Sequence, residues 1–593
     1  MKNMPDLINF RTLWNLVLQK KSTLIWGQVI TLMTILISIP IPLMLPILVD
    51  EVLLEQPALF VGTIDGLFGN GSAFYYIAIV AITVICLRFF HFLFSAMISK
   101  IFTYISKHVT FEVRRILISH LQHVCMNEYE SLGSGAIGAN LVTDVNTLDN
   151  FIITGASRFV ASVMMLIAIA IVMILIHPIL GLMILIIQPL VMLLSKKIAK
   201  SVSHLKADEN QAIENFQNNF GETLELFGQI KASNKEQQFF DDATLKAKKI
   251  QTTSNEYSYK SVVYERFSFT IFLMAFEILR ASGLIMVAYS DLSIGMMFAM
   301  FGYIWFMMTP VQDILSMQYS YATAKAALNR INKILELKLE SNGEQTLISH
   351  VTGVDIKIDN LYFSYIKDKP LLRNISLEIK ANEKVALIGA SGSGKTTLAQ
   401  LVSGFYTKNS GAIHYNNISI DDIDKQSLRN SIFLVLQMPI LFNNSLRFNI
   451  TMGNEEIRDE EIFKALSIAQ LDDMISNTTD GLDTIVGKHG MRLSGGQRQR
   501  LSVARMIISN PEIVIFDEST SALDVHTELN LFNSLKPILK NKTVITIAHR
   551  LSTVKNAHKI FVLDDGKLVQ SGTHKELEFE DGHYQDFLKN QLV

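Results

Sequence analysis

Charged residues and cysteines are scarce in this sequence of 593 residues. Asp, Glu, Lys and Arg make up 18% of it, whereas an ordinary soluble protein carries about 25%. The two cysteines, Cys86 and Cys125, are too few for a disulfide framework or a zinc cluster, so we interpret both as unreactive packing residues. The formal net charge of -2 excludes a strongly basic balance, so we expect no nucleic-acid partner. Residues 1–22 lack an apolar core followed by a small-residue cleavage site, so we expect no cleavable signal.

Long apolar runs take the place of the missing charge. Hydrophobic residues make up 49% of the chain and the mean hydropathy is +0.28. The runs fall within residues 22–317, whereas residues 350–593 have the composition of a soluble α/β domain. Because about 18 apolar residues in succession can span a bilayer, the sequence predicts a helical membrane domain. The predicted spanning helices are at residues 22–49, 72–99, 159–176, 179–195, 267–290 and 292–311.

The distribution of Lys and Arg predicts the orientation of these helices. The loop at residues 50–71 contains neither residue type, whereas the loops at 100–158 and 196–266 are basic. Basic loops stay in the cytoplasm, so we expect both termini there. Apolar spacing at residues 110–124 and 209–229 predicts that the membrane helices continue well into the cytoplasm.

A phosphate-binding loop follows a short apolar strand at residues 385–388. The pattern G-x-x-x-x-G-K-[ST] at residues 389–396 leads into a helix that begins near Leu398. Glycines let backbone N–H groups wrap phosphates, Lys395 neutralises phosphate charge, and Thr396 can ligate magnesium. The predicted nucleotide-binding residues of this loop are Gly389, Ser391, Gly392, Ser393, Gly394, Lys395, Thr396 and Thr397.

A second apolar strand, at residues 513–516, ends in Asp517 and Glu518. A carboxylate at the end of a strand that faces a phosphate loop is suited to hold magnesium, so we assign that role to Asp517. Glu518 can then polarise the attacking water as a general base.

Small residues also precede a predicted helix at residues 497–508. The entry to this helix is Leu-Ser-Gly-Gly-Gln, at residues 493–497. Such an entry directs free N–H groups and the positive end of the helix dipole toward an anion. Taken alone, the pattern is also compatible with a flexible turn.

The ordered set of motifs resembles the ABC transporter superfamily. Residues 389–397 are similar to its Walker A loop, residues 516–518 to the end of Walker B, and residues 493–497 to its signature motif. The resemblance implies that ATP contacts Ser494, Gly495, Gly496 and Gln497. It covers residues 350–593 by motif and residues 20–335 by pattern.

The resemblance implies further site residues. Gln437 matches the Q-loop glutamine, with a catalytic and a metal-contacting role, and residues 521–524 match the D-loop. His549 matches the switch histidine, and Tyr365 matches the aromatic residue that stacks on adenine. An alternative explanation for Tyr365 is a strand aromatic. Taken alone, His549 would be a core or surface histidine, and Gln437 would carry no information.

The implied architecture is an exporter-type half-transporter. Residues 1–335 form the helical transmembrane domain, residues 336–352 a linker, and residues 353–593 an α/β P-loop NTPase domain of the ABC type. The family implies ATP and Mg²⁺ as cofactors and a second chain as partner, here in a homodimer. Each ATP is then held between the Walker A loop of one chain and the signature motif of the other. We expect the protein in a bacterial inner membrane.

The predicted function is ATP-driven export or flipping of an apolar or amphipathic substrate, such as a lipid, drug or peptide, by alternating access. Met and aromatic residues crowd residues 296–308, and such side chains make adaptable apolar surfaces. At least half of them are equally explained as lipid-facing or helix-packing residues. The alternatives are an ATP-gated channel or regulatory protein, and an importer on the same scaffold.

Two features depart from this simple pattern. Lys488 stands where exporters of this type carry an acidic residue, at a stretch thought to touch the cytoplasmic loops. Charged or titratable residues also lie within predicted membrane helices: Arg88, His91, Glu277 and Arg280. Such residues usually face a partner or a wet cavity. Glu277 is expected to balance Arg88 or to pair with Arg280 along its own helix.

Overall fold

The computed structural model describes residues 7–55, 59–69, 71–347, 353–366, 368–487, 490–518, 522–548 and 550–591. The chain forms two compact units. The first comprises Met1–Ser119 and Gly135–Glu336, and the second comprises His120–Ser134 and Leu337–Val593.

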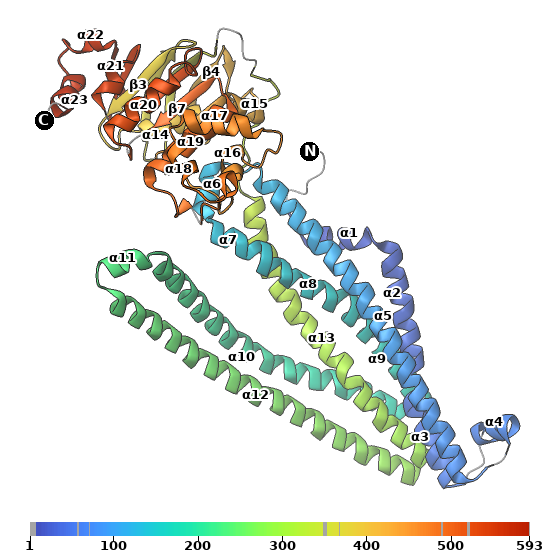
Figure 1. Cartoon of the computed structure of the whole chain (residues 1–593). Coiled ribbons are helices and arrows are strands. Elements are labelled where there is room, and N and C mark those ends of the chain that lie inside the picture. The colour runs from blue at the N-terminus through green and yellow to red at the C-terminus, as the bar shows by residue number, and fades with distance from the viewer. Residues whose placement is uncertain are drawn as a thin grey trace. The chain divides into compact units, whose positions relative to one another are not determined.

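The first unit is built from helices (Figure 1). They are α1 (Phe10–Leu18), α2 (Lys21–Ser38), α3 (Pro40–Pro46), the π-helix η1 (Ile47–Leu53), α4 (Leu59–Phe68), α5 (Ala73–Leu121), α7 (Ser134–Ala139), the π-helix η2 (Asn140–Asp144), α8 (Val145–Ile153), the π-helix η3 (Thr154–Phe159), α9 (Val160–Ile176), α10 (Pro178–Glu225), α11 (Phe227–Ala232), α12 (Glu236–Tyr289) and α13 (Ile294–Leu335).

Among the described residues, five helical segments are long and apolar enough to cross a membrane. They are Lys21–Leu53, Ala73–Leu121, Ile137–Ile176, Glu236–Tyr289 and Ile294–Ile314. These segments cover five of the six predicted spanning helices to within two residues at their ends. The remaining one, at residues 179–195, lies within α10, where the side chains of residues 187–203 fall outside the described part of the chain.

The long arms α10 and α12 lie side by side and are joined by α11 (Figure 1). Polar contacts hold them together. Glu209 of α10 accepts a hydrogen bond of 2.7 Å from the Ser254 hydroxyl of α12 and one of 2.6 Å from Lys206. The Lys206 ammonium also lies 4.7 Å from the centre of the Tyr257 ring. As predicted, both helices continue far beyond the residues needed to span a bilayer.

A buried carboxylate joins the end of the first spanning segment to the beginning of α13. Asp50 is 9% exposed. Its carboxylate accepts hydrogen bonds from the Ser293 hydroxyl and, at 2.8 Å, from the Gly295 N–H. Ser293 in turn caps α13 by accepting a bond of 3.1 Å from the N–H of Met296. Asp50 therefore satisfies a free donor of the first turn of α13, as a helix-capping residue would.

This close approach leads us to expect that Gly295→Ala destabilises the protein. An added Cβ would lie 2.6 Å from the Cα of Pro46 and 2.5 Å from Asp50 Oδ2, so backbone must move. Overpacking of this kind costs about 1–3 kcal/mol. The measurement is the thermal unfolding midpoint in detergent. Gly221→Ala is the control, since its Cβ meets nothing within 4 Å and alanine favours a helix by about 1 kcal/mol. An unchanged midpoint in Gly295→Ala would contradict the expected clash.

Glu277 and Arg280 pair along their own helix. Glu277 Oε2 lies 2.5 Å from an Arg280 guanidinium nitrogen, one turn apart on α12. The two side chains are 55% and 52% exposed. The own-helix alternative is therefore the arrangement present, and a contact between Glu277 and Arg88 stays a prediction.

The methionine and aromatic side chains of α13 divide into two groups. Met297, Met300, Tyr303 and Met307 are between 0% and 4% exposed, which confirms a packing role for them. Phe298 and Trp305 are 43% and 47% exposed. Phe298 and Trp305 are therefore accessible to lipid, a partner chain or substrate.

The second unit contains a six-stranded sheet in the order β10-β9-β3-β8-β7-β6 and a four-stranded sheet in the order β2-β1-β4-β5. In the six-stranded sheet, only β10 is antiparallel to its neighbour. The strands are β1 (Ile356–Phe363), β2 (Leu372–Ile379), β3 (Lys384–Gly389), β4 (Ser410–Tyr415), β5 (Ile418–Ser419), β6 (Ile432–Val435), β7 (Ile513–Asp517), β8 (Thr543–Ile547), β9 (Lys559–Asp564) and β10 (Lys567–Gly572).

Burial explains the two kinds of sheet. Every residue of β7 is buried, as expected of a central parallel strand covered on both faces. β1 and β2 instead alternate between buried and exposed residues, as antiparallel strands with one covered face do. One hydrophobic core joins residues of both sheets with α14 (Lys395–Val402).

Helices complete the second unit (Figure 1). They are α6 (Met126–Leu132), α14 (Lys395–Val402), α15 (Lys425–Ser431), α16 (Leu446–Thr451), α17 (Asp459–Ile468), α18 (Asp472–Ser476), the 3₁₀ helix η4 (Gly481–Asp483), α19 (Gly495–Ser509), α20 (Val525–Leu535), α21 (Leu551–Lys555), α22 (His574–Leu577) and α23 (His583–Gln591).

Backbone hydrogen bonds explain why α6, which is distant in sequence, belongs to the second unit. Val124 forms a β-bridge with Leu339. The Cys125 N–H donates to the carbonyl of Lys338 at 2.9 Å, and the Glu340 N–H donates to the carbonyl of His123 at 2.8 Å. The segment that contains α6 is thus attached to the chain that follows α13.

Candidate active site

The predicted motifs follow neighbouring parallel strands. Strands β3, β8, β7 and β6 are adjacent in the sheet. The phosphate loop follows β3, Asp517 ends β7, and Gln437 comes soon after β6. Because the carboxyl ends of parallel strands meet at one edge of a sheet, these residues gather there. His549 comes just after β8 but lies outside the described residues, as do Lys488 and Ser521.

Glycines of the phosphate loop are required by its shape. Gly394 has φ +96°, and a Cβ there would lie 2.5 Å from Leu372 Cδ2. At Gly389 a Cβ would lie 2.0 Å from the carbonyl oxygen of Leu563. The loop backbone therefore lies close to Leu372 and Leu563. It leads directly into α14, whose first residue is Lys395.

Lys395 is buried at the base of this loop, with 6% exposure. Its ammonium donates to the carbonyls of Gly389 and Ala390 at 2.9 and 2.8 Å. Burial lowers the pKa of Lys395, while the nearby carboxylates of Glu518 and Asp517 oppose that shift. Carbonyl groups of the loop thus accept two of the hydrogen bonds that the Lys395 ammonium can donate.

Two hydroxyl groups of the loop suit a phosphate and a metal ion. Ser393 is 3% exposed, and its Oγ has no hydrogen-bond partner among the described residues. A buried hydroxyl left unpaired costs about 1–3 kcal/mol, so this atom fits a phosphate oxygen. The Thr396 hydroxyl lies 3.1 Å from Asp517 Oδ1. Together the two side chains offer the oxygen ligands that magnesium prefers.

Glu518 contacts Gln437 directly. The Gln437 side-chain amide donates to Glu518 Oε2 at 2.6 Å. Glu518 also has φ +46°, in the left-handed region. For a residue other than glycine this conformation costs about 1–3 kcal/mol and is concentrated at functional sites. The structure therefore brings Gln437, Glu518, Asp517 and Thr396 together as the sequence predicts.

Gln499 is a further residue of this site, which the sequence motifs do not predict. This side chain of α19 is 3% exposed. Its amide donates to the backbone carbonyl of Gln437 at 2.9 Å, and its Oε1 accepts from the N–H of Ala522 at 3.2 Å. Gln499 therefore connects the chain around Gln437 to the chain that follows Glu518. A polar residue on the buried face of α19 is the signal that could have found it.

The predicted anion-binding entry is the first turn of α19. This helix begins at Gly495, two residues earlier than predicted. Ser494 caps it by accepting a bond of 3.2 Å from the Gln497 N–H, and the Gln497 side chain accepts one of 2.8 Å from the Ser494 N–H. This reciprocal capping box rules out the flexible-turn alternative. A Cβ at Gly496 would lie 3.0 Å from Leu523, so small residues are needed here.

Tyr365 lies beside α14. Its hydroxyl is 3.1 Å from the hydroxyl of Thr397. Its ring contacts Phe363 and Tyr406 edge-on, with centroid distances of 4.9 and 5.3 Å. Tyr365 is 51% exposed, so one part of the ring stays accessible next to the phosphate loop. Its predicted stacking on adenine agrees with this position and stays a prediction.

Comparison with known proteins matches both halves of the chain. Residues 372–521 match the family "ABC transporter", and residues 40–311 match "ABC transporter transmembrane region". The ATP-dependent lipid A-core flippase of Legionella pneumophila (strain Paris) is 31% identical over 84% of this chain and 85% of its own. The lactococcin-G-processing and transport ATP-binding protein LagD of Lactococcus lactis is 30% identical over 91% of this chain and 78% of its own.

The fold also matches a solved structure, that of a bacterial Atm1-family ABC exporter with ATP bound. The TM-score is 0.85, at 22% identity, over 96% of this chain and 99% of that one. Both domains and their order thus agree in one chain. The chain therefore belongs to the ABC transporter family, as a multi-pass, exporter-type half-transporter that couples ATP hydrolysis to transport.

Proposed function

We propose that this half-transporter exports an apolar or amphipathic substrate, such as a lipid, drug or peptide, from a bacterial inner membrane. The observation that carries the proposal is the intact cluster of Thr396, Asp517, Glu518 and Gln437 beside the phosphate loop. It supports a chain that hydrolyses ATP, as a pump must. The relatives named for lipid A-core flipping and lactococcin G transport support this range of substrates.

The chain's own residues account for the proposed hydrolysis. Lys395 opposes the negative charge of the phosphates, and the free hydroxyl of Ser393 donates to a phosphate oxygen. Mg²⁺, held by Thr396 and Asp517 with Gln437 nearby, would supply charge stabilisation. Glu518 accepts a proton from the attacking water. The hydrogen bond from Gln437 aims the Glu518 carboxylate and restricts its rotation.

The proposed working unit is a homodimer. The four residues at 494–497 form a helix N-terminus, which favours an anion. In the proposed dimer they contact ATP held by the Walker A loop of the other chain, with Tyr365 against the adenine and His549 near the γ-phosphate. The exposed Phe298 and Trp305 of α13 are candidate contacts for substrate or lipid.

Transport into inverted vesicles tests the proposal. The purified chain is reconstituted in lipid, and compounds are screened for stimulation of its ATPase activity. Stimulating compounds should then accumulate inside inverted vesicles only when ATP is supplied outside. Net movement in the opposite direction would identify an importer. Hydrolysis with only passive, gradient-driven flux would identify a channel or regulator.

The position of Gln499 predicts an effect on turnover. Gln499→Leu keeps the buried volume but removes the two hydrogen bonds described above, so the Gln437 carbonyl and the Ala522 N–H each lose a partner. We expect kcat for ATP to fall about tenfold, equivalent to about 1.4 kcal/mol, while KM changes less than threefold. Steady-state ATPase assays provide both values. Ser502→Ala, at a buried polar residue one turn further along α19, is the control. Parental turnover in Gln499→Leu would show that the bridge is dispensable.

A further inference from the structure

A chain of contacts leads from Tyr365 to α6, the short helix between the second and third membrane helices. Tyr406 is 8% exposed and lies against Tyr365 with the two rings nearly perpendicular, at 89°. The Tyr406 hydroxyl donates to the Glu130 carboxylate, with distances of 2.9 and 3.1 Å to its two oxygens. Glu130 belongs to α6. A phenol bound to a carboxylate is a charge-assisted hydrogen bond, stronger than a neutral one.

Both ends of this connection are held in place. The segment before α6 forms the bridge between Val124 and Leu339, and Cys125 Sγ lies 3.8 Å from the hydroxyl of Thr407, the residue after Tyr406. Burial and the bond to Glu130 both raise the pKa of Tyr406, so its hydroxyl keeps its proton and remains a donor. The phenol therefore stays neutral and able to donate at physiological pH.

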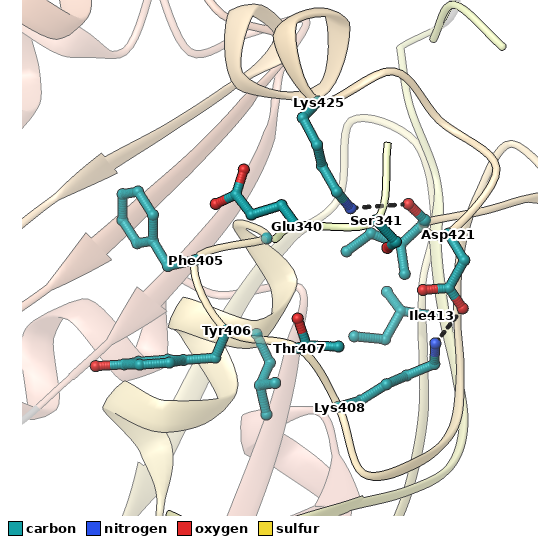
Figure 2. Close-up of a pocket in the computed structure, with 12 residues that line it drawn as sticks. Glu340, Ser341, Phe405, Tyr406, Thr407, Lys408, Ile413, Asp421 and Lys425 are labelled. Atoms are coloured by element: carbon teal, nitrogen blue, oxygen red, sulfur yellow. Dashed lines mark hydrogen bonds and ion pairs between the residues drawn. The ribbon is translucent and has the colours of Figure 1, made fainter. Parts of the chain in front are cut away.

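The loop that carries Tyr406 is fixed on its other side as well. Figure 2 shows a pocket at this loop in which the Lys408 ammonium pairs with Asp421 and the Lys425 ammonium donates to the Ile420 carbonyl. In the same view the Tyr406 side chain extends away from the Lys408–Asp421 ion pair. The ion pair of Lys408 with Asp421 thus holds the loop, while Tyr406 is directed to the aromatic cluster and to Glu130.

Tyr365 is held between two supports. Its hydroxyl bonds to Thr397 and, at 3.4 Å, to Gln400 of α14, and its ring rests against Tyr406. A perpendicular aromatic contact favours one relative orientation of the two rings. Stacking on a base requires one particular plane, so any shift of Tyr406 changes the face that Tyr365 presents.

We propose that Tyr406 and Glu130 are positioning residues that hold Tyr365 in the plane needed to stack on adenine, so that movement of α6 alters the affinity for ATP. The inference rests on the proposed role of Tyr365 at the adenine. Coupling between sites is reciprocal. Nucleotide binding therefore also stabilises one position of α6, between two membrane helices, by the same free energy.

The test compares variants of the full-length protein in lipid. Tyr406→Phe keeps the ring but removes its bond to Glu130, Glu130→Ala removes the acceptor, and Glu130→Gln retains one. We expect KM for MgATP to rise about three- to tenfold in the first two, with kcat within twofold, and to stay near the parental value in Glu130→Gln. Glu128→Ala, on the same helix, is the matched control.

Inorganic tripolyphosphate, which has no base, separates positioning from general damage to the site. Its inhibition constant should not change in Tyr406→Phe or Glu130→Ala, because only the base contact is affected. An equal weakening of ATP and tripolyphosphate, or an unchanged KM for ATP in both variants, would overturn the proposed positioning.

Tyr365→Ala shows whether a negative result concerns the positioning role of Tyr406 and Glu130 or the proposed contact between Tyr365 and adenine. If Tyr365→Ala raises KM for ATP while Tyr406→Phe and Glu130→Ala do not, Tyr365 contacts the base without help from α6. If Tyr365→Ala itself leaves KM for ATP unchanged, the adenine contact is wrongly assigned and the positioning role falls with it.

Discussion

Replacement of Glu518 by glutamine is expected to reduce ATP hydrolysis at least about 100-fold, since a positioned general base contributes about 10²–10⁴-fold. The side chain keeps its size and can still bond to Gln437, which now contacts Glu518 Oε2 at 2.6 Å. Basicity is lost, so no group at this position accepts the proton of the attacking water. Lys395, Ser393 and Thr396 are untouched, so nucleotide binding should survive. The variant should accumulate with ATP bound between two chains.

Two measurements check this expectation. Steady-state ATPase activity gives the loss of turnover, and equilibrium binding of ATP gives the retained affinity. Glu512→Gln is a suitable control, because Glu512 directly precedes β7, whereas Glu518 directly follows it. Near-parental hydrolysis by Glu518→Gln would remove Glu518 from the role of general base.

Lys395→Ala should weaken the binding of ATP, whereas Glu518→Gln should retain binding and lose hydrolysis. The ammonium is the buried cation of the phosphate loop, at 2.9 and 2.8 Å from the carbonyls of Gly389 and Ala390. Bonds that involve a charged group contribute about 1.5–3 kcal/mol, which corresponds to roughly ten- to hundredfold in affinity. We therefore expect the dissociation constant for ATP to rise by at least tenfold, measured by titration calorimetry or fluorescence.

The control for this variant is a second buried lysine. Lys542 is 9% exposed and donates to Asn510 and to the carbonyl of Pro511, and burial lowers its pKa as it does for Lys395. Lys542→Ala therefore removes a comparable buried cation outside the phosphate loop. Affinity for ATP should survive in Lys542→Ala at temperatures where the protein is folded. If both variants bind alike, the phosphate loop has been assigned wrongly.

Much of the site could be predicted because its chemistry depends on local sequence. The loop at residues 389–397 needs glycine at strained positions, and it is recognisable from nine consecutive residues. Asp517 and Glu518 stand at the end of an apolar strand, where the topology of parallel sheets puts functional residues. Apolar length likewise predicts where membrane helices lie.

The contacts that escaped prediction join residues far apart in the chain. Gln499 binds the Gln437 carbonyl across 62 residues, and Tyr406 binds Glu130 across 276. The sequence shows Gln499 only as a polar residue on the buried face of a helix, and it does not identify the partner of either residue. Only the folded chain brings the partners together.

The apolar pattern also did not predict the interruptions within the first membrane helix. The first predicted membrane helix, at residues 22–49, is divided in the structure into α2, α3 and the beginning of the π-helix η1. Proline lacks the N–H that continues a helix, and Pro40, Pro42 and Pro46 fall at this division. The apolar run therefore predicted the span but not its internal breaks.

The bridge between Val124 and Leu339 has a mechanical consequence for the helices attached to it. α5 ends at Leu121 and α13 ends at Leu335, so both run into the bridge within a few residues. The chain segments that follow the two helices thus share one attachment point, so a displacement of the bridge affects both segments. They cannot be drawn apart at this end without breaking the bridge. Any increase in the separation between α5 and α13 must therefore be smallest near the bridge and larger farther along the helices.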